Sequence, residues 1–247
     1  MIKSSLLIVI PARAGSKRIK NKNLRKIGRV SLLEIKIKDC LTIKKARIIV
    51  STNSKKIAQK SIKLGAEVPY LRSKKYSTSK ASTLACVLDL LRFLKKEENY
   101  TPEYIGVMPP TNPFLKTETI KTAFTTLKKN KEFNSVVGYT ESDAHPFQFI
   151  STKKNKKIKF NLINYLGKKY SDYERTQDWP KAYTVSASVK IIRNRYLNRF
   201  LNNYSPIINL KTFDVKNSIG VKVDNIENFD INNENDLKIA NALNQII

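Results

Sequence analysis

Small and basic residues gather in one loop of the chain, at a spacing that suits an anionic ligand. The loop follows the apolar stretch 6–10; its Gly15 permits close approach of a ligand to the backbone, and the Ser16 hydroxyl offers a hydrogen bond. Its cationic side chains are Arg13, Lys17 and Lys22. Because guanidinium and ammonium groups bind phosphate oxygens, we expect this loop to hold a phosphorylated ligand. The alternative is that the loop is an ordinary solvated connection between two elements.

Two common phosphate-binding motifs are excluded for this loop. It lacks the Gly-Lys-Ser/Thr ending of a Walker loop, and it has no G-x-G-x-x-G dinucleotide turn. Its place in the chain is nevertheless informative, since loops at the carboxyl ends of parallel strands are where open α/β sheets bind ligands. The loop is therefore expected to form part of a binding site if stretch 6–10 is such a strand.

Alternating elements from residue 5 to 139 predict an open, mostly parallel α/β sheet. Apolar stretches indicate strands at 6–10, 47–52, 67–71, 104–108 and 135–139. Amphipathic stretches between them indicate helices at 31–42, 54–64, 81–96 and 117–129. The first stretch is too short and too closely followed by Pro11 to resemble a signal peptide.

The alternation stops after residue 139. Residues 140–181 are polar and dotted with aromatic residues, with a lysine-rich run at 153–159, and they suggest a hairpin-bearing insertion. A strand is expected at 183–192, and helices at 194–203 and 234–247. We therefore expect residues 1–247 to form a single domain, flanked by helices and with 140–181 as a small protruding insertion.

The rare reactive residues exclude several kinds of site. His145 is the only histidine, so neither a His-based triad nor a zinc cluster can be built. Cys40 and Cys86 are the only cysteines and lie in helical patterns, without metal-binding spacing or a disulfide framework. Two buried thiols in the reducing cytoplasm are expected.

The charge of the chain is strongly positive. Lys and Arg number 47 and Asp and Glu 20, for a net charge of +27. Such a charge attracts nucleic acids, but 36 of the basic residues are Lys, which favours compositional drift and solvated helix faces. No aromatic-and-basic recognition motif supports nucleic-acid binding, and no apolar run approaches the roughly 18–20 residues of a membrane span. Neither partner is expected.

Several segments, in order, resemble motifs of the acylneuraminate cytidylyltransferase family, the CMP-sialic acid synthetases. The first is P-A-R-x-G-S-K with K-N after a four-residue gap, at 11–23. The others are I-I-V-S-T-N at 48–53, A-S-T at 81–83, P-T-N-P at 110–113 and F-D-I-N through D-L at 229–237. The resemblance covers roughly residues 5–125 well and 170–245 loosely.

This resemblance implies a Rossmann-like, GT-A-like nucleotidyltransferase fold shared with CMP-Kdo synthetases. The implied reaction transfers CMP from CTP to the anomeric hydroxyl of a nine-carbon α-keto sugar acid and releases pyrophosphate, with Mg²⁺ as cofactor. The implied setting is cell-surface polysaccharide biosynthesis. By the same likeness, 140–181 is a dimerisation arm that covers the sugar site of a neighbouring copy.

The resemblance also implies roles for individual residues. The catalytic clamp on the triphosphate is Arg13, Lys17 and Lys22. The nucleotide-binding residues are Arg13, Ala14, Gly15, Ser16, Asn23, Ser82 and Thr83. The sugar-binding residues are Pro109, Thr111, Asn112, Arg175 and Ser186. The metal ligands are Asp230 and Asn232.

Ordinary structural roles compete with some of these assignments. Ser82 precedes a helix and suits its amino-terminal cap. Asp230 and Asp236 precede the last helix, where acidic groups favour the positive end of its dipole. Arg175 is placed to form a surface ion pair, with Glu174 or Asp178.

Four positions depart from the family pattern, three of them on the sugar side. Pro109 stands where glutamine is usual, Ser186 replaces an asparagine, and Thr184 stands where arginine is often found. Asn232 replaces the second aspartate of the tail, which lowers the charge offered to a metal. The sugar is therefore open: a legionaminic- or pseudaminic-like acid is expected, with Kdo and a nucleotide-binding homologue without turnover as alternatives.

Overall fold

A six-stranded sheet of order β4-β1-β5-β7-β6-β8 forms the centre of the computed structural model, which describes residues 4–149, 164–202 and 212–246. Its strands are β1 (Leu6–Pro11), β4 (Ala46–Ser51), β5 (Tyr104–Val107), β6 (Ser135–Glu141), β7 (Tyr183–Arg193) and β8 (Ser218–Lys222). β7 runs antiparallel to both of its neighbours, and every other pair is parallel. The predicted mostly parallel sheet is confirmed, and the carboxyl ends of its parallel strands share one edge.

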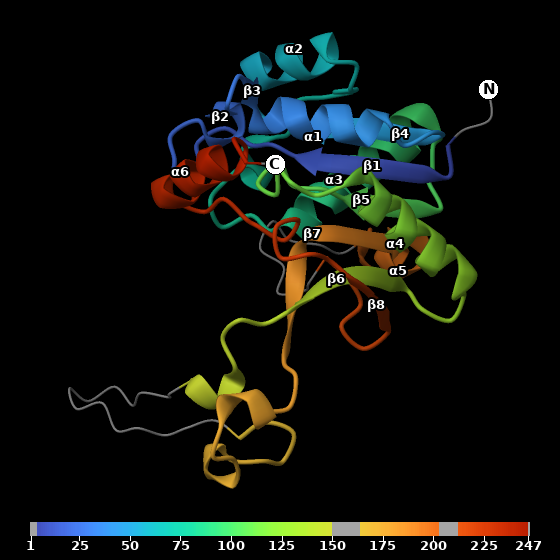
Figure 1. Ribbon diagram of the computed structural model, residues 1–247. Coiled ribbons are helices and arrows are strands. Elements are labelled where there is room, and N and C mark those ends of the chain that lie inside the picture. Colours follow the sequence, from blue (N-terminus) through green and yellow to red (C-terminus); the bar gives the residue numbers. More distant parts are fainter. Residues whose placement is uncertain (1–3, 150–163, 203–211, 247) are drawn as a thin grey trace.

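Helices cover both faces of this sheet (Figure 1). They are α1 (Leu32–Leu41), α2 (Lys55–Lys63), α3 (Thr83–Glu98), α4 (Thr117–Lys129), α5 (Asn194–Leu197) and α6 (Glu234–Leu243). A small hairpin of β2 (Lys26–Ile27) and β3 (Val30–Ser31) precedes α1. Serine side chains cap α1, α2 and α3 by accepting a hydrogen bond from the backbone N–H three residues on, which fixes where each helix begins.

Successive residues of β1 enter two different cores. Leu6, Ile8 and Ile10 pack with α1 and α4, whereas Leu7 and Val9 pack with α3. A parallel strand covered on both faces needs such a continuous apolar run, so the run itself predicts the central position of β1. Cys40 and Cys86 are free and buried in α1 and α3, as expected.

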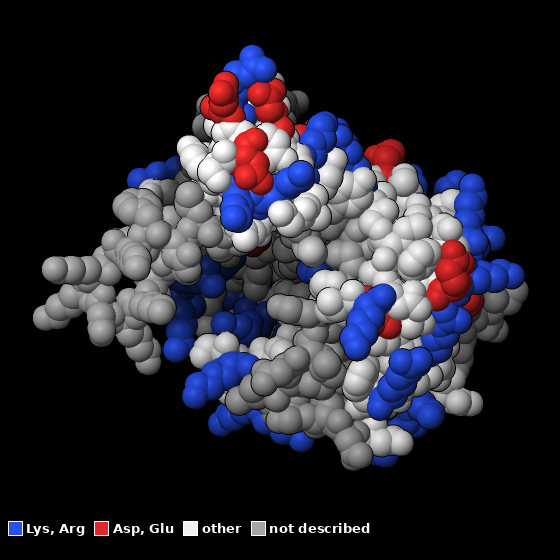
Figure 2. Space-filling model, turned by 90° about the horizontal axis from the view of Figure 1, so that it is seen from below, with Lys and Arg blue, Asp and Glu red and all other residues white. Residues whose placement is uncertain are grey.

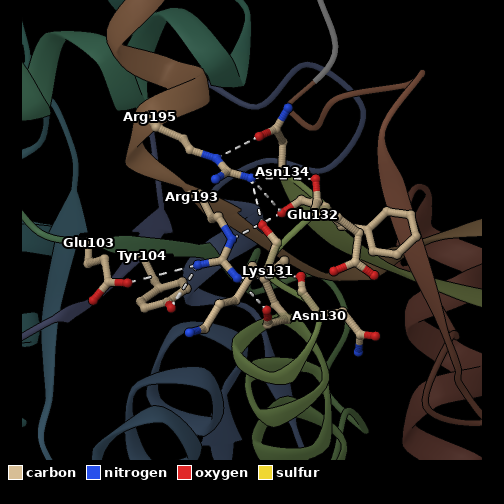
Figure 3. Close-up of polar contacts among 10 residues, drawn as sticks. Glu103, Tyr104, Asn130, Lys131, Glu132, Asn134, Arg193 and Arg195 are labelled. Atoms are coloured by element: carbon tan, nitrogen blue, oxygen red, sulfur yellow. Dashed lines mark hydrogen bonds and ion pairs between the residues drawn. The ribbon is translucent and has the colours of Figure 1, made fainter.

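Two arginines hold the end of β7, the antiparallel strand, in place (Figure 3). They lie at the sheet edge opposite the carboxyl ends of the parallel strands. The buried Arg193 donates to the Tyr104 hydroxyl at 2.9 Å and to the backbone oxygens of Leu127 and Phe133 at 2.6 and 3.0 Å. Arg195 donates to Asn134 Oδ1 at 2.9 Å. These bonds attach the end of β7 to the connection between α4 and β6.

The segment between β6 and β7 projects from the body of the protein (Figure 1). Its described part has its own aromatic cluster, in which His145 stacks near Phe147 and Trp179 at centroid distances of 4.6 and 4.9 Å. His145 Nδ1 accepts from the Phe147 N–H, and its Nε2 bonds to the Pro180 carbonyl at 2.8 Å. The lysine-rich run expected in a hairpin, 153–159, lies outside the described residues.

Two local predictions need correction, and one strand was not predicted. Residues 67–71 form no strand: only Glu67 bridges to Ile49, and Pro69, which has no N–H, follows two residues later. The helix expected at 194–203 is shorter, since α5 passes into a 3₁₀ turn at Asn198–Phe200. β8 was not expected at all.

No helix among the described residues has the length and hydrophobicity that crossing a membrane requires.

Candidate functional site

A cavity of about 350 Å³ opens at the carboxyl end of β1. It is lined by Pro11, Arg13, Ser16, Lys17, Arg18, Lys22, Asn23, Ser79 and Asn232. Figure 2 shows Lys and Arg side chains gathered in a hollow of the molecule. The cavity thus combines four cationic side chains with hydroxyl and amide groups, a donor-rich lining that suits a polyanion.

Two asparagines hold the basic loop in place. Asn53, directly after β4, accepts a hydrogen bond from the Ala14 N–H at 2.8 Å. Asn23 donates to the Arg13 carbonyl at 3.0 Å. Gly15 has a φ of 78°, and a Cβ added there would meet nothing within 4 Å. Both bonds therefore fix the Arg13–Ala14 peptide, while Gly15 directly after it lies open to an approaching ligand.

Lys22 is one of the two partly buried cations of the site, the other being Arg13. Lys22 begins a 3₁₀ turn, Lys22–Leu24, and is half-buried. Burial lowers the pKa of its ammonium group, the nearby Asp230 carboxylate raises it, and the Arg18 guanidinium lowers it. Desolvated cations placed side by side favour a bound anion, which relieves their mutual repulsion.

The segment after β8 returns to this edge of the sheet and is held there by residues that follow β5. The Thr111 carbonyl accepts from the Ile231 N–H at 2.9 Å. The buried Asn112 side chain donates to the carbonyls of Asn228 and Phe229 at 3.3 and 3.1 Å. Neither Thr111 nor Asn112 lines the cavity. In this structure they position residues 228–231, the part of the tail segment 228–237 that they contact. That Thr111 and Asn112 contact the sugar stays a prediction.

Asp230 and Asn232 meet the basic loop at the cavity. Asn232 Nδ2 donates to Asp230 Oδ2 at 2.9 Å, and Asn232 Oδ1 accepts from Arg18 Nη1 at 3.2 Å. Asp230 Oδ1 is buried, with no hydrogen-bond partner in the part of the chain that the structure describes. Asp236 instead accepts from the N–H groups of Asn232 and Asn233, and so belongs to the cap of α6.

This donor set fits a magnesium ion. Mg²⁺ is commonly held by one or two carboxylates together with substrate phosphates and water. Asp230 Oδ1 is a carboxylate oxygen without a hydrogen-bond partner among the described residues, on a side chain bonded to Asn232 of the cavity lining. Among the described residues, no three His, Cys, Asp or Glu side chains come together as a metal site. A cation held here would therefore complete its coordination with ligand and water oxygens.

Ser82 and Thr83 lie at the start of α3, outside the lining of the cavity. Ser82 caps the helix by accepting from the Ala85 N–H at 3.0 Å, which is the structural alternative weighed above. Ser79, in the preceding loop, reaches the cavity instead. That loop is held by the buried Arg72, which donates to Cys86 Sγ at 2.8 Å and the Tyr76 carbonyl at 3.3 Å.

Three predicted sugar-side residues lie elsewhere in the described structure. Pro109 is half-buried just after β5, and Ser186 is fully buried in β7 with its hydroxyl 2.7 Å from that of Ser188. Arg175 forms an exposed ion pair with Asp178 at 2.9 Å on the projecting segment. None of them lines the cavity. The structure thus gathers the predicted triphosphate and metal residues but not the predicted sugar residues.

Sequence reasoning missed Arg18, Asn53 and Ser79. Arg18 lies inside the first motif but at a position that the motif leaves unspecified. Asn53 closes the quoted segment 48–53, and its place after a predicted strand is the signal that would have identified it. Ser79 carries no such signal, because it lies in a polar loop without regular spacing.

A family model matches nearly the whole chain, and individual relatives match about half to three quarters of it. The family model described as cytidylyltransferase matches residues 7–245. A CMP-N,N'-diacetyllegionaminic acid synthase of Legionella pneumophila is 40% identical over 119 residues, 48% of this chain and 51% of that relative, so the match spans about half of the relative's length. A pseudaminic acid cytidylyltransferase of Campylobacter jejuni is 28% identical over 72% of this chain and 73% of that protein.

The fold is shared with a solved CTP complex. CMP:2-keto-3-deoxy-manno-octonic acid synthetase complexed with CTP superposes with a TM-score of 0.67 at 12% identity, covering 98% of this chain and 99% of that one. At such low identity the likeness concerns the fold alone. It confirms the expected Rossmann-like nucleotidyltransferase architecture.

Proposed function

The chain belongs to the cytidylyltransferase family, and from this premise we propose that it transfers CMP from CTP to a nonulosonic acid and releases pyrophosphate. The observation that carries the proposal is the cationic cavity at the carboxyl end of β1, where Arg13, Lys17 and Lys22 converge beside Asp230. A nucleoside triphosphate is a polyanion that such a cavity can bind.

In the proposed reaction the anomeric hydroxyl oxygen of the sugar acid attacks the α-phosphorus of CTP in line. The new sugar–phosphate bond forms as the bond between the α-phosphorus and the bridging oxygen breaks, and that oxygen leaves on pyrophosphate with its electron pair. The hydroxyl proton passes to solvent. Arg13, Lys17 and Lys22 hold the triphosphate and neutralise charge that grows on its oxygens, while the loop backbone around Gly15 aligns the leaving group.

We propose magnesium as the cofactor, with Asp230 Oδ1 as its protein ligand. The free carboxylate oxygen and the adjacent cationic cavity support this choice. Held by Asp230, such an ion would supply Lewis-acid charge to the phosphates of the ligand. The protein residues retain the tasks of binding and aligning the triphosphate.

A nine-carbon keto acid of legionaminic or pseudaminic type is the proposed acceptor. Support comes from the relatives described above, whose names specify those acids. The absence of a side-chain donor at Pro109 and the engagement of Ser186 with Ser188 make N-acetylneuraminate itself a weaker choice. A Kdo-type octulosonate is the second candidate, because a relative from Elusimicrobium minutum, a 3-deoxy-manno-octulosonate cytidylyltransferase, is 24% identical over 79% of this chain.

The proposed setting is the cytoplasm, in the biosynthesis of cell-surface polysaccharide, with neither nucleic acid nor membrane as partner. The two buried free thiols support a reducing compartment. We also propose a homodimer joined through the projecting segment. Its support is a set of exposed apolar side chains on or beside that segment: Phe149, Leu166, Tyr170, Tyr183 and Val185.

The test is release of pyrophosphate from CTP and Mg²⁺ with a panel of legionaminic, pseudaminic, N-acetylneuraminic and Kdo acids. The proposal expects turnover with one of the first two acids. Lys22→Gln should reduce the rate about 10²–10³-fold, as expected on removal of a charge that stabilises the transition state. Lys20→Gln removes a charge from the same loop outside the cavity and should stay near wild type. Turnover with Kdo alone supports the second candidate, and no pyrophosphate from any acid contradicts both.

A further inference from the structure

Asn232 joins two charged side chains that come from distant parts of the sequence. Its Oδ1 accepts from Arg18 Nη1 at 3.2 Å, and its Nδ2 donates to Asp230 Oδ2 at 2.9 Å. The orientation of the amide is determined by these partners, since a flipped amide would face N–H groups with its own NH₂ and a carboxylate with its oxygen. Asn232 is thus a link between a cation and an anion at the edge of the cavity.

With Asn232 in this position, hydrogen-bonding groups of both Asp230 and Arg18 stay available to a ligand. One oxygen of Asp230 is used by the amide, and the other, Oδ1, is buried without a hydrogen-bond partner among the described residues. On the other side, the hydrogen bonds within the described chain use one of the five N–H donors of Arg18. Arg18 lines the same cavity as Arg13, Lys17 and Lys22, so its remaining donors are available to an anion there.

An aspartate at this position would not make the same link. A carboxylate accepts from Arg18 but cannot donate to Asp230, and two carboxylates side by side repel one another. The asparagine therefore has a property that the family's usual aspartate lacks: it fixes the neighbouring carboxylate while holding the guanidinium.

We propose that Asn232 is a positioning residue, not a metal ligand: it holds Arg18 against the triphosphate and leaves Asp230 as the single protein carboxylate for the divalent cation. This inference rests on the proposed function, since it takes CTP as the ligand of the cavity. It assigns Arg18 to the triphosphate site and revises the expectation that Asn232 coordinates the metal.

The first experiment measures CTP binding by calorimetry in EDTA, where a metal ligand has no effect. Arg18→Gln should weaken binding about tenfold, as expected for loss of a charged hydrogen bond. Asn232→Ala should weaken it about three- to tenfold, because Arg18 is no longer held. The double variant should be no weaker than Arg18→Gln alone, since both changes remove one interaction. Lys20→Gln, outside the cavity lining, is the control for general charge and should change binding less than twofold.

The second experiment measures how much Mg²⁺ or Mn²⁺ tightens CTP binding. Asp230→Asn should abolish the tightening, whereas Asn232→Ala should keep it within about threefold of wild type. Asn232→Gln, which retains an amide but moves it by one methylene, should match the alanine variant. A melting temperature for each variant identifies one that is not folded, and the glutamine variant then carries the test.

Four results overturn the inference. The first is a metal-free CTP affinity that does not change in Asn232→Ala and Asn232→Gln. The second is additive losses of CTP affinity in the double variant. The third is that Asn232→Ala loses as much metal-induced tightening of CTP binding as Asp230→Asn does. A wild-type chain that binds CTP only with added metal also contradicts it. A wild-type chain that binds no CTP under either condition contradicts the proposed function itself, so the two failures are distinguishable.

Discussion

Four cations share one cavity, and the protonation of one of them, Lys22, depends on its surroundings. Arg13, Lys17, Arg18 and Lys22 line it, and Asp230 is the carboxylate that affects Lys22 most. Partial burial lowers the pKa of Lys22, because it disfavours the charged form of the ammonium group. The charge needed to hold a triphosphate is therefore lost at a lower pH than for a lysine in water.

Replacing Lys22 by arginine should extend activity to higher pH. The wild-type kcat/KM for CTP, which reports the free enzyme, should fall as pH rises through the lowered pKa of Lys22, below the ordinary value of 10.5. In Lys22→Arg the guanidinium stays protonated, so the alkaline fall should move to higher pH even though the changed geometry lowers the maximum by about tenfold. Lys20→Arg is the matched control. Identical alkaline limbs in Lys22→Arg and wild type would contradict this role.

Ser82 offers a test between a helix cap and a nucleotide contact. Its side chain caps α3, so Ser82→Ala should lower the free energy of unfolding by about 0.5–2 kcal/mol, whereas Ser82→Asn retains a capping oxygen and should stay near wild type. The KM for CTP should change less than about twofold in both variants when it is measured well below the melting temperature. Thermal unfolding and steady-state kinetics provide the two measurements. An unchanged melting temperature with a tenfold higher KM in Ser82→Asn would indicate a nucleotide contact instead.

At the scale of elements, α1 carries a buried cation directly beneath the tail segment. Lys36 is fully buried, and its Nζ lies 3.8 Å from Asp39 Oδ2, beyond hydrogen-bond distance. Burial lowers the pKa of Lys36, while Cys40, Asp39 and Glu227 raise it. The ion pair with Asp39 is long and Lys36 Nζ has no hydrogen-bond partner among the described residues, so these neighbours do not offset the desolvation of the charge. A side chain of similar length without the charge should not incur that cost.

Lys36→Met should therefore stabilise the protein. We expect a higher melting temperature at neutral pH, since Asp39, whose side chain is 30% exposed, can be hydrated once its cation is removed. Because the lysine binds its proton more weakly in the folded than in the unfolded state, wild-type stability should rise with pH between the lowered folded pKa and 10.5. The methionine variant should lack this rise. Lys38→Met, on the exposed side of α1, should have little effect, and a Lys36→Met chain less stable than wild type would contradict the argument.

The strongly patterned elements were predictable because their cause is local. The apolar run of β1, the serine caps of the first three helices and the amphipathic stretch of α4 each act within about one turn or strand. β8 was missed because Ser218–Lys222 alternates weakly and is only partly covered, so its pairing with β6 is a tertiary effect. The expected strand at 67–71 failed because Pro69 interrupts hydrogen bonding after Glu67.

The candidate site likewise has a part that the sequence predicts and a part that it does not. The basic loop was predictable because its cations lie within ten residues of one another. The contact between Arg18 and Asn232 joins residues 214 positions apart, and it depends on how Thr111 and Asn112 hold the returning tail. Such long-range positioning is decided by tertiary packing, which no spacing in the sequence records.

At the scale of the molecule, the net charge says little about assembly, whereas the projecting segment indicates where two copies could meet. The net charge of +27 belongs to the whole chain, whereas four basic side chains of the described residues line the cavity. The projecting segment is the stronger clue to assembly, because it exposes apolar side chains while its aromatic cluster supplies a small core of its own. Exposed apolar side chains gathered on one projecting segment are typical of an interface between proteins.

The proposed homodimer can be broken on that segment without touching the cavity. Leu166 and Val185 are 72% and 62% exposed, so Leu166→Glu and Val185→Glu together should place unpaired charges in the interface and give a monomeric mass by light scattering. CTP binding should persist, because the cavity lining comes from loops of the body. The KM for the sugar acid should rise at least about tenfold if the neighbour's segment covers that site.

Ile62→Glu is the matched control, since Ile62 is 58% exposed on α2, far along the chain from the projecting segment. It should leave mass and kinetics unchanged, which separates the interface from a general effect of added charge. A wild-type chain that is monomeric at working concentrations removes the dimer outright. A dimeric double variant with normal kinetics instead places the interface elsewhere, because two buried carboxylates without partners are too costly to retain at a contact.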